Sequence, residues 1–446
     1  MTICGHKIEL NIKKVTAGGH GIGYYAGKSI IVPYAVPGDL LSVKIKNDSA
    51  FAEIIDIKKF SEFRKMPDCP FHYAFDKSKS VFCGGCNLQM MNYTKQLDCK
   101  LAIVNDLPNL KAPEIIPSEH IFAYRNKIQM PTAGKKGKII TGIYQQGTHK
   151  ITPVKNCLLH SSRANALLND LQIILNKSGI PPYDETTRSG ILRHIILRQS
   201  FFKNEFMLIL VTKTKYCPSL KYIISGIRKK YPDIVSIFLN INPRKTNVIL
   251  GDVTINLTGK KRIMERIEDL FFEISPNSFF QINTAQTERL YNTIRSYADL
   301  KGQETVFDLY SGCGGISLYL SRFCKNVVGI EKVSSAVEDA RRNAALNGIK
   351  NIRFIRENAE YAIRKISQKR NSVFILDPPR AGCSEIILQS ILKYSPSIII
   401  YASCNPITLS RDMDILSEKY KLDTMKLVDM FPQTAHIECV ARLIKS

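Results

Sequence analysis

Residues 304–323, ETVFDLYSGCGGISLYLSRF, decide the fold of the C-terminal half, because an apolar strand runs through a glycine-rich turn directly into a helix. In that turn Gly312, Gly314 and Gly315 lack side chains, so a ligand can approach the backbone and the start of the helix. Glu331 ends the next apolar strand, about 20 residues farther on, where a carboxylate can accept hydrogen bonds from ribose hydroxyls. This spacing predicts a site for an adenosine-type nucleoside.

Apolar strands continue to alternate with amphipathic helical segments through the rest of the chain. The strands are NVVGIE (326–331), NIRFIREN (351–358), SVFILDPP (372–379) and SIIIYASC (397–404). Such alternation is typical of an open α/β sheet, in which ligands bind at the carboxyl ends of the strands. We therefore predict a Rossmann-like α/β domain over residues 273–446 that carries the reaction centre.

Two nucleoside cofactors fit this pattern, NAD and S-adenosylmethionine. Asn358 follows the third strand, where a methyltransferase has a polar residue that faces adenine, although a simple turn residue is the alternative. Asp377 opens the tetrad DPPR (377–380), which matches the D/N-P-P-Y/F/R element of enzymes that methylate bases and nucleotides. The tetrad favours S-adenosylmethionine over NAD.

Cys404 follows the fifth strand, on the same rim as the glycine turn, Glu331 and Asp377. A helical run begins just after it, so we expect the positive end of that helix to favour the thiolate. A thiolate here suits methylation of uracil C5, which becomes nucleophilic only after a nucleophile has added to C6. An inert buried cysteine is the alternative for any one of the 12 cysteines.

Methylation at C5 also requires a base that removes the C5 proton before the thiol leaves. The segment MFPQTAHIECV (430–440) offers His436 and Glu438. Either side chain could accept a proton when suitably placed, so chemistry alone leaves both as candidates.

The N-terminal half has a different organisation. Short alternating strands separated by turns predict a small antiparallel barrel over residues 1–60. Its glycine-rich turn AGGHGIGYYAG (17–27) is not followed by a helix, which argues against dinucleotide binding. Residues 61–272 mix a cysteine-bearing loop with strand-like and helical runs, so we expect a central α+β domain, with the helical stretch 93–122 packing against the C-terminal domain.

Composition limits the classes of function. Lys and Arg number 63 against 39 Asp and Glu, a net charge of +24 that favours a polyanionic partner such as RNA. No apolar run is long enough for a membrane-spanning helix, and the N-terminus lacks the apolar core of a signal peptide, so we expect a cytoplasmic protein without a membrane partner. The 12 cysteines are then thiols available for catalysis or metal binding.

Ten segments in one order make the chain resemble the RNA uracil-5-methyltransferases, most closely the bacterial 23S rRNA branch that carries a TRAM domain and a 4Fe-4S iron-sulfur cluster. The segments are GGHGIGYYAGKSIIVPYAVPGD (18–39), CGGCNLQMMNYTKQLDCK (83–100), YRNKIQM (124–130), GIYQQGTHKITPVKNC (142–157), GILRHIILR (190–198), ISPNSFFQINTAQTERLY (274–291), DLYSGCGGISLYLS (308–321), ILDPPRAGC (375–383), YASCNPITLSRD (401–412) and DMFPQTAHIECV (429–440). Together they cover nearly the whole chain and are far more specific than any single motif.

The resemblance implies methylation of uracil C5 by S-adenosylmethionine. It assigns the family's nucleophile to Cys404 and its base to Glu438, which settles the choice left open above. Many relatives have Asn or Thr where Gly315 stands, so no side-chain contact is expected there. The expected cofactor contacts, two of which belong to the glycine turn, are Gln281, Tyr310, Gly312, Gly315, Glu331, Asn358 and Asp377.

By the same resemblance the cluster ligands are Cys69, Cys83, Cys86 and Cys157. Spacing alone supports a metal site only moderately, because there is one C-x-x-C pair, and structural zinc is the alternative. Thirteen residues separate Cys69 from the pair, more than is usual in relatives, which makes His72 a conceivable substitute. We expect a structural or RNA-folding role for the cluster, since this methylation needs no redox step.

The barrel is expected to be an RNA-binding TRAM domain, with Tyr24 and Tyr25 either exposed to RNA or packed in its core. A target uracil has to leave its stack to reach the nucleophile, so Phe279 or Phe280 could support a flipped base, with core packing as the alternative. The leading hypothesis is a monomeric enzyme that methylates structured RNA, namely 23S rRNA.

Three other hypotheses are kept. A tRNA uracil-5-methyltransferase is the nearest, although such enzymes commonly lack both the TRAM domain and the cluster cysteines. A non-catalytic RNA-binding ribosome-assembly factor is disfavoured by the intact Asp377, Cys404 and Glu438. An NAD-dependent oxidoreductase is disfavoured by the DPPR and SCNP elements.

Overall fold

Strand β1 (Lys7–Val15) shows why the N-terminal residues form a barrel, because buried and exposed side chains alternate along it. The computed structural model describes residues 6–46, 50–73, 82–217, 219–366 and 371–446, and its first five strands pair in the antiparallel order β3-β2-β1-β4-β5. A bridge between Ile31 and Phe51 brings the two edges of this sheet together around one apolar core. The other strands are β2 (Gly21–Tyr25), β3 (Lys28–Val32), β4 (Leu40–Ile45) and β5 (Ala52–Lys59).

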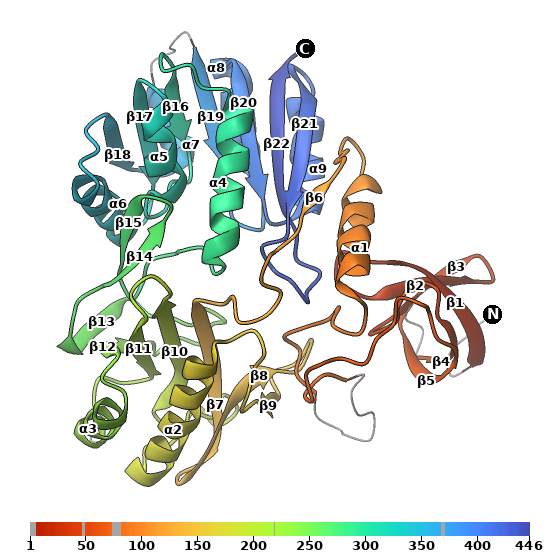
Figure 1. Cartoon of the computed structure of the whole chain (residues 1–446), viewed down its shortest axis with the longest axis vertical. Coiled ribbons are helices and arrows are strands. Elements are labelled where there is room, and N and C mark those ends of the chain that lie inside the picture. The colour runs from red at the N-terminus through yellow and green to blue at the C-terminus, as the bar shows by residue number, and fades with distance from the viewer. Residues whose placement is uncertain (1–5, 47–49, 74–81, 218, 367–370) are drawn as a thin grey trace.

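The central part of the chain forms a seven-stranded sheet in the order β13-β12-β11-β10-β7-β8-β9. Helices α2 (Ser162–Ser178) and α3 (Leu220–Lys230) pack against it through buried residues such as Leu171 and Ile227 (Figure 1). Strands β10 and β11 are buried along their whole length, so both faces of the sheet are covered. The strands are β7 (Lys127–Lys135), β8 (Lys138–Tyr144), β9 (Ile151–Pro153), β10 (Leu192–Ser200), β11 (Glu205–Thr212), β12 (Ile234–Ile241) and β13 (Val253–Gly259).

A hairpin of β14 (Ile263–Ile267) and β15 (Leu270–Ile274) lies between the central and C-terminal sheets (Figure 1). Its buried Phe272 shares an apolar core with Ile209 of the central sheet and with Val306 of the C-terminal sheet. The hairpin therefore packs the two sheets against each other. Its strand β15 runs across residue 272, the position at which the central domain was expected to end.

Eight strands form the C-terminal sheet, in the order β18-β17-β16-β19-β20-β22-β21-β6. Every described strand of this sheet runs parallel except β22 (Glu438–Lys445), which confirms the Rossmann-like prediction. The others are β6 (Ile115–Ile116), β16 (Thr305–Asp308), β17 (Asn326–Glu331), β18 (Ile352–Arg356), β19 (Ser372–Leu376), β20 (Ile398–Ser403) and β21 (Tyr420–Val428). The helices are α4 (Thr284–Ala298), α5 (Gly315–Leu320) with the 3-10 turn Ser321–Phe323, α6 (Ser334–Leu346), α7 (Ala359–Lys365), α8 (Glu385–Tyr394) and α9 (Pro406–Leu416).

Helix α1 (Tyr93–Asn105) connects the N-terminal half to the C-terminal sheet (Figure 1). Nζ of the fully buried Lys100 lies 2.6 Å from Oδ1 of Asp429, and Oη of Tyr93 donates to Oδ2 of the same carboxylate at 2.7 Å. A buried ion pair is tolerated only when further hydrogen bonds satisfy its charges, so these contacts hold α1 in one position. None of the helices in the described part of the chain has the length and apolar character to cross a bilayer.

Candidate functional site

A cavity of about 650 Å³ lies at the carboxyl ends of β16, β17, β19 and β20, the edge at which open α/β sheets bind their ligands. Because its walls come from several strand ends, the tertiary fold brings together residues that lie far apart in the sequence. Eight of the expected catalytic and cofactor-binding residues line it: Gln281, Tyr310, Gly312, Glu331, Asn358, Asp377, Cys404 and Glu438.

The glycine turn holds Glu331 ready for a ligand. Its carboxylate accepts hydrogen bonds from the backbone N–H of Gly312 at 3.1 Å and of Val333 at 2.8 Å, while Gly312 adopts a positive φ of 52°. Gly315 does not line the cavity. A Cβ atom at Gly315 would lie 2.1 Å from Oη of the buried Tyr291, so the glycine at this position is required for packing.

Asn358 lines the cavity and also begins helix α7. Its Oδ1 accepts from the backbone N–H of Glu360 at 3.4 Å, and its Nδ2 donates to Oε2 of Glu360 at 2.8 Å. The side chain of Glu360 is held in turn by Oγ of Ser384 at 2.7 Å. Glu360 and Ser384 both line the cavity, and no motif in the sequence had pointed to them.

Sheet register places the expected nucleophile and base beside each other. Strands β20 and β22 are antiparallel, and Ser403 pairs with Cys439. Cys404 directly follows the last residue of β20 and Glu438 is the first residue of β22, so the two lie at neighbouring strand ends. Asp377 follows β19, which pairs with the other side of β20. All three side chains line the same cavity.

Burial raises the pKa values of these acidic groups. It raises the pKa of Asp377 to about 7, helped by the nearby Asp308, and it raises the pKa of Glu438 well above its ordinary value, helped by Asp377. The guanidinium of Arg380 opposes the shift at Glu438. At neutral pH the site therefore favours the protonated form of Glu438, while Asp377 is near its midpoint.

The expectation that the helix after Cys404 would favour its thiolate is wrong for the free protein. Burial, together with the neighbouring Glu438 and Asp377, raises the pKa of Cys404 to about 11. Arg380 acts in the opposite direction but does not compensate. The helix that follows Cys404 is adjacent in sequence, whereas the raised pKa comes from desolvation and from carboxyl groups on other strands.

Arg380 and His436 form a contact at the edge of the cavity. Nη2 of Arg380 lies 2.9 Å from Nδ1 of His436, and Nδ2 of Asn405 donates to the carbonyl of Arg380 at 2.9 Å. Burial and Arg380 lower the pKa of His436 to about 4, which leaves the imidazole neutral at pH 7. His436 does not line the cavity, whereas Glu438 does, so the geometry favours Glu438 as the base.

The loop before α4 separates the two candidate phenylalanines. Phe279 is 63% exposed and lines the cavity, whereas Phe280 is buried against Phe272 in the core. Arg198 of β10 holds this loop, because its Nη2 donates to the carbonyls of Ser278 and Pro276. A strand arginine of the central sheet therefore supports the wall of the cavity, which strand periodicity gave no means of predicting.

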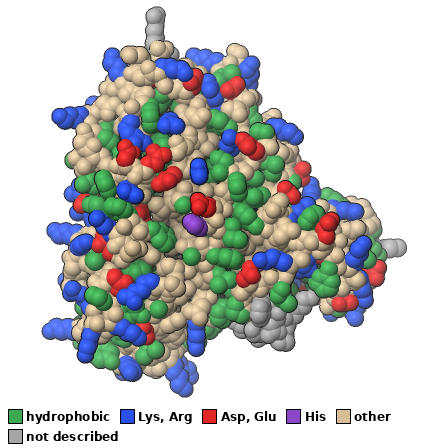
Figure 2. Space-filling view, viewed as in Figure 1, with side chains coloured by type: hydrophobic (Ala, Val, Ile, Leu, Met, Phe, Trp, Pro, Cys, Tyr) green, Lys and Arg blue, Asp and Glu red, His purple; other side chains and the backbone are tan. Residues whose placement is uncertain are grey.

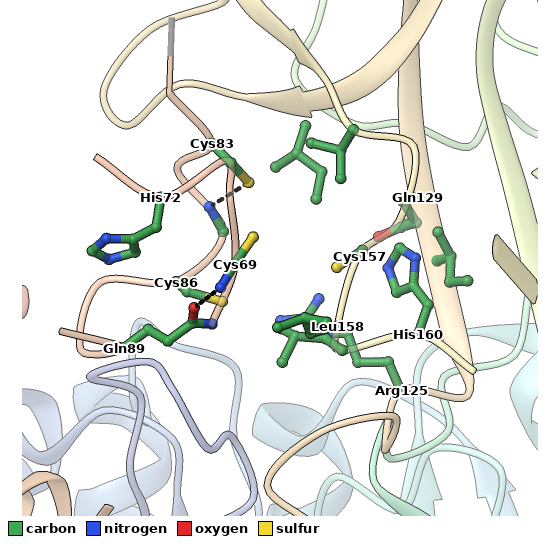
Figure 3. A pocket seen from close by; sticks show the side chains of 15 residues that line it. Cys69, His72, Cys83, Cys86, Gln89, Arg125, Gln129, Cys157, Leu158 and His160 are labelled. Carbon is green, nitrogen blue, oxygen red and sulfur yellow. Dashed lines mark hydrogen bonds between the residues drawn. The ribbon is translucent and has the colours of Figure 1, made fainter. Parts of the chain in front are cut away.

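A second, smaller cavity of about 100 Å³ lies between the cysteine loop and the central sheet. Figure 3 shows the sulfur atoms of Cys69, Cys83 and Cys86 facing that of Cys157 across it. The ring of His72 turns away from the four sulfurs and packs edge-on against Tyr34, at 5.3 Å between ring centroids. Cys69 thus lies among the sulfurs, although residues 74–81 of the loop that follows it lie outside the described part of the chain.

The groups around this cavity fit an iron-sulfur cluster. Burial raises the pKa of Cys83 to about 12, so its thiol is neutral without a metal, and burial likewise raises the pKa of the other three cysteines. Nε2 of Gln89 and Nε of Arg125 are buried donors without a hydrogen-bond acceptor among the described residues. Thiolates and sulfides would supply the missing charge and acceptors.

The cysteine sulfurs surround a space rather than converging on one point. No group of three or more His, Cys, Asp or Glu side chains in the described ranges is arranged to hold a single metal ion. A zinc ion requires sulfurs about 2.3 Å from one centre, whereas four thiolates that bind a four-iron cluster are spread around a larger body. The four cysteines, as they are placed in the described part of the chain, are therefore not arranged around a single zinc ion.

Tyr24 and Tyr25 lie on the outer surface of the barrel, where they are 54% and 39% exposed. The basic side chains are spread around the periphery of the face in Figure 2, and hydrophobic side chains occupy much of its centre. Exposed aromatic rings near cations are the groups on which single-stranded nucleic acids stack. The barrel therefore offers side chains of the type that binds RNA.

Comparison with known proteins places this geometry among RNA-modifying enzymes. The family model for tRNA (Uracil-5-)-methyltransferase matches residues 239–446. A relative from Bacillus cereus strain ATCC 10987, called an uncharacterized RNA methyltransferase, is 38% identical over 97% of this chain and 95% of its own length. A relative with the same description from Listeria innocua is 39% identical over 98% of this chain and 97% of its own length.

A solved structure matches the whole architecture. It is the crystal structure of Pyrococcus abyssi tRNA (uracil-54, C5)-methyltransferase in complex with S-adenosyl-L-homocysteine, which is 28% identical with a TM-score of 0.78. The match covers 98% of this chain and 100% of that protein. The likeness therefore extends through the N-terminal barrel and the central sheet as well as the C-terminal domain.

Proposed function

This chain belongs to the RNA uracil-5-methyltransferase family, and we propose that it transfers a methyl group from S-adenosylmethionine to C5 of a uracil in 23S rRNA. The observation that carries the proposal is one cavity lined by Cys404, Glu438 and Asp377 together with the expected cofactor-binding residues. In this reading Glu331 binds the ribose of the cofactor, and the exposed Phe279 supports the flipped uracil.

The first step is addition of Cys404 to the uracil ring. Sγ of Cys404 bonds to C6, its proton passes to a carboxylate of the cavity, and the electron pair of the C5–C6 bond moves toward O4 to give an enolate. The raised pKa of Cys404 keeps the thiol protonated until the target uracil enters the cavity. The protonated thiol is protected from other electrophiles. Arg380 is the cation that opposes this shift and can stabilise the negative charge.

The second step makes the new carbon bond and the third restores the ring. C5 of the enolate takes the methyl group from the sulfonium, leaving S-adenosylhomocysteine. Glu438 as a carboxylate then removes the C5 proton, the C5–C6 double bond re-forms, and the bond from C6 to Sγ of Cys404 breaks. Burial, together with the neighbouring Asp377, raises the pKa of Glu438, which makes this carboxylate a stronger base than an ordinary glutamate.

We include a 4Fe-4S cluster in the proposal. The thiolates of Cys69, Cys83, Cys86 and Cys157 would hold it, on the grounds of the enclosed cavity and the unpaired donors described above. When bound, the cluster supplies a rigid covalent link between the cysteine loop and the segment after β9. Methyl transfer requires no electron from it.

A tRNA substrate is the second candidate. It is favoured by the Pyrococcus abyssi tRNA enzyme, which matches this chain over its whole length. An N-terminal barrel therefore does not by itself distinguish the two kinds of substrate. The choice of 23S rRNA rests on the resemblance of the barrel and the four cysteines to that branch of the family.

The experiment that tests the proposal uses purified protein with methyl-labelled S-adenosylmethionine. One reaction contains 23S rRNA and the other contains tRNA, both from cells that lack the gene, and digestion to nucleosides identifies the product. We expect 5-methyluridine in 23S rRNA and none in tRNA. Label in tRNA alone would select the second candidate, and absence of 5-methyluridine from both would contradict the proposal.

A further inference from the structure

Asn87, the residue after Cys86, connects three parts of the molecule that lie far apart in the sequence. Its Nδ2 donates to the carbonyl of Gly18 in the glycine turn of the barrel at 2.8 Å, and its Oδ1 accepts from the backbone N–H of Ala435 at 2.8 Å. The backbone N–H groups of Asn87 and Leu88 both donate to the carbonyl of Gln433, at 3.2 and 3.1 Å.

The glycine turn of the barrel comes unusually close to this junction. Gly19 has a φ of 80°, and a Cβ atom there would lie 2.3 Å from Nδ2 of Asn87 and 3.1 Å from Cβ of Ala435. Gly27, in the same barrel, has a similar φ of 76° but would bring its Cβ within 4 Å of nothing. A glycine is thus required at position 19 for the turn to lie this close to Asn87, whereas Gly27 makes no such close approach.

The segment that Asn87 contacts leads directly to the active site. Phe431 and Glu438, at its two ends, line the catalytic cavity. Between them Gln433 adopts a φ of 70° and exchanges two side-chain and backbone hydrogen bonds with Gln96 of α1, both at 3.0 Å. Oη of Tyr124 donates to the carbonyl of Pro432 at 3.1 Å. The loop 431–437 is therefore shaped by contacts with the N-terminal half.

We propose that Asn87 is a positioning residue for the methylation reaction, and that the Gly18–Gly19 turn presses it against the loop 431–437 so that Glu438 faces the uracil. The barrel then serves the active site directly, in addition to binding RNA. This inference rests on the proposed function and assigns a role to a glycine-rich turn that dinucleotide binding does not explain.

The first test separates the two contacts of the Asn87 side chain. Asn87→Ala loses both, whereas Asn87→Asp keeps an acceptor for Ala435 N–H and replaces the donor to Gly18 with a carboxylate oxygen that repels the Gly18 carbonyl. We expect Asn87→Ala to lower kcat by about 10- to 100-fold, as a misplaced base does, with the dissociation constant of S-adenosylmethionine unchanged. Asn87→Asp should retain more of kcat than Asn87→Ala.

A step-specific signature distinguishes this role from general destabilisation. Proton removal from C5 comes after methyl transfer, so Asn87→Ala should accumulate the covalent methylated adduct with ordinary RNA, detectable as a slow band on denaturing gels. Formation of the adduct with 5-fluorouridine RNA, which needs no proton removal, should remain near the wild-type rate. If Asn87→Ala slowed turnover on ordinary RNA and adduct formation with 5-fluorouridine RNA equally, the effect would be merely structural and the inference would be overturned.

The second test compares two glycines of the barrel that have the same backbone strain. Gly19→Ala should reproduce the kcat defect of Asn87→Ala, and Gly27→Ala should leave kcat within about twofold of wild type. If Gly19→Ala raised only KM for RNA, the barrel would act in binding alone and the inference would fail. A wild-type protein without any methylation of RNA would instead refute the proposed function.

Discussion

The catalytic cavity and the cysteine cavity both enclose buried thiols, yet they suit opposite tasks. About 650 Å³ around Cys404 is enough to admit a nucleoside, and carboxyl groups lie beside the thiol. About 100 Å³ between Cys69, Cys83, Cys86 and Cys157 admits no nucleoside, and the neighbouring polar groups are donors. The first cavity can exchange protons with a substrate, whereas the second can satisfy a compact anionic group.

The acidity of a thiol in these two cavities does not reveal its task. Burial raises the pKa of Cys404 to about 11 and that of Cys83 to about 12, so the two are nearly alike in this respect. Their neighbours differ instead, because Cys404 lies between Asp377 and Glu438 on adjacent strands. A change of neighbours should therefore affect one cavity and leave the other intact.

Removing the thiol of the larger cavity should have the largest effect. We expect Cys404→Ala to lower methyl transfer by roughly 10⁴-fold or more, because the covalent route is lost, and to abolish the adduct with 5-fluorouridine RNA. Cys439→Ala is the matched control, since Cys439 is adjacent in the sheet but fully buried. An adduct in the Cys404→Ala protein would show that another residue is the nucleophile.

Replacing the base should separate two steps within that cavity. Glu438→Gln keeps the shape of the side chain, and we expect it to lower turnover by about 10²- to 10⁴-fold while the methylated covalent adduct accumulates. His436→Asn, which alters a residue outside the cavity, should have a much smaller effect. If the two variants behaved in the opposite way, His436 would be the base.

The smaller cavity is tested by its metal content. Cys83→Ser should lose iron and the visible absorption of the cluster, because a serine hydroxyl is a poor ligand at this site. Cys99→Ser, at a buried cysteine of α1, should keep both. Calorimetry should give wild-type affinity for S-adenosylmethionine in both variants. Iron content equal to that of wild type in Cys83→Ser would remove the cluster from the proposal.

The smallest effect concerns the pH dependence of Cys404. Its raised pKa means that alkylation by iodoacetamide should accelerate as pH rises from 7 toward 10, by up to about tenfold per unit. Asp377 is ionised above a pH of about 7 and contributes to that raised pKa. Asp377→Asn should therefore move the profile to lower pH. A shift to higher pH would contradict the proposed electrostatic role of Asp377.

Sequence predicted the Rossmann-like sheet because its signal is local: each strand and turn carries its own pattern. The rim residues Glu331, Asp377 and Cys404 could be grouped from sequence for the same reason, since each follows directly on an apolar strand. The protonation of Cys404 could not be predicted, because its raised pKa depends on burial and on Glu438, which a different strand brings beside it.

Contacts between different helices and strands had no sequence signal. Arg198 looks like an ordinary strand residue, although it holds the loop that carries Phe279. Gly315 belongs to the glycine turn expected to contact the cofactor, and its close approach to Tyr291 is a packing constraint that no sequence pattern indicates. In both cases the partner lies on an element remote in sequence, and only the tertiary fold reveals it.

Strand β22 pairs on one side with β20 and on the other with β21, both of which precede it along the chain. Strands β21 and β22 are consecutive along the chain, whereas β20 lies farther back in the sequence, so the pairing of β22 with β20 is the longer-range of the two contacts. A chain in which β22 has not paired with β20 would lack Glu438 beside Cys404. Such a species could hold RNA without completing a methylation, so catalytic competence would report that the last strand had entered the sheet.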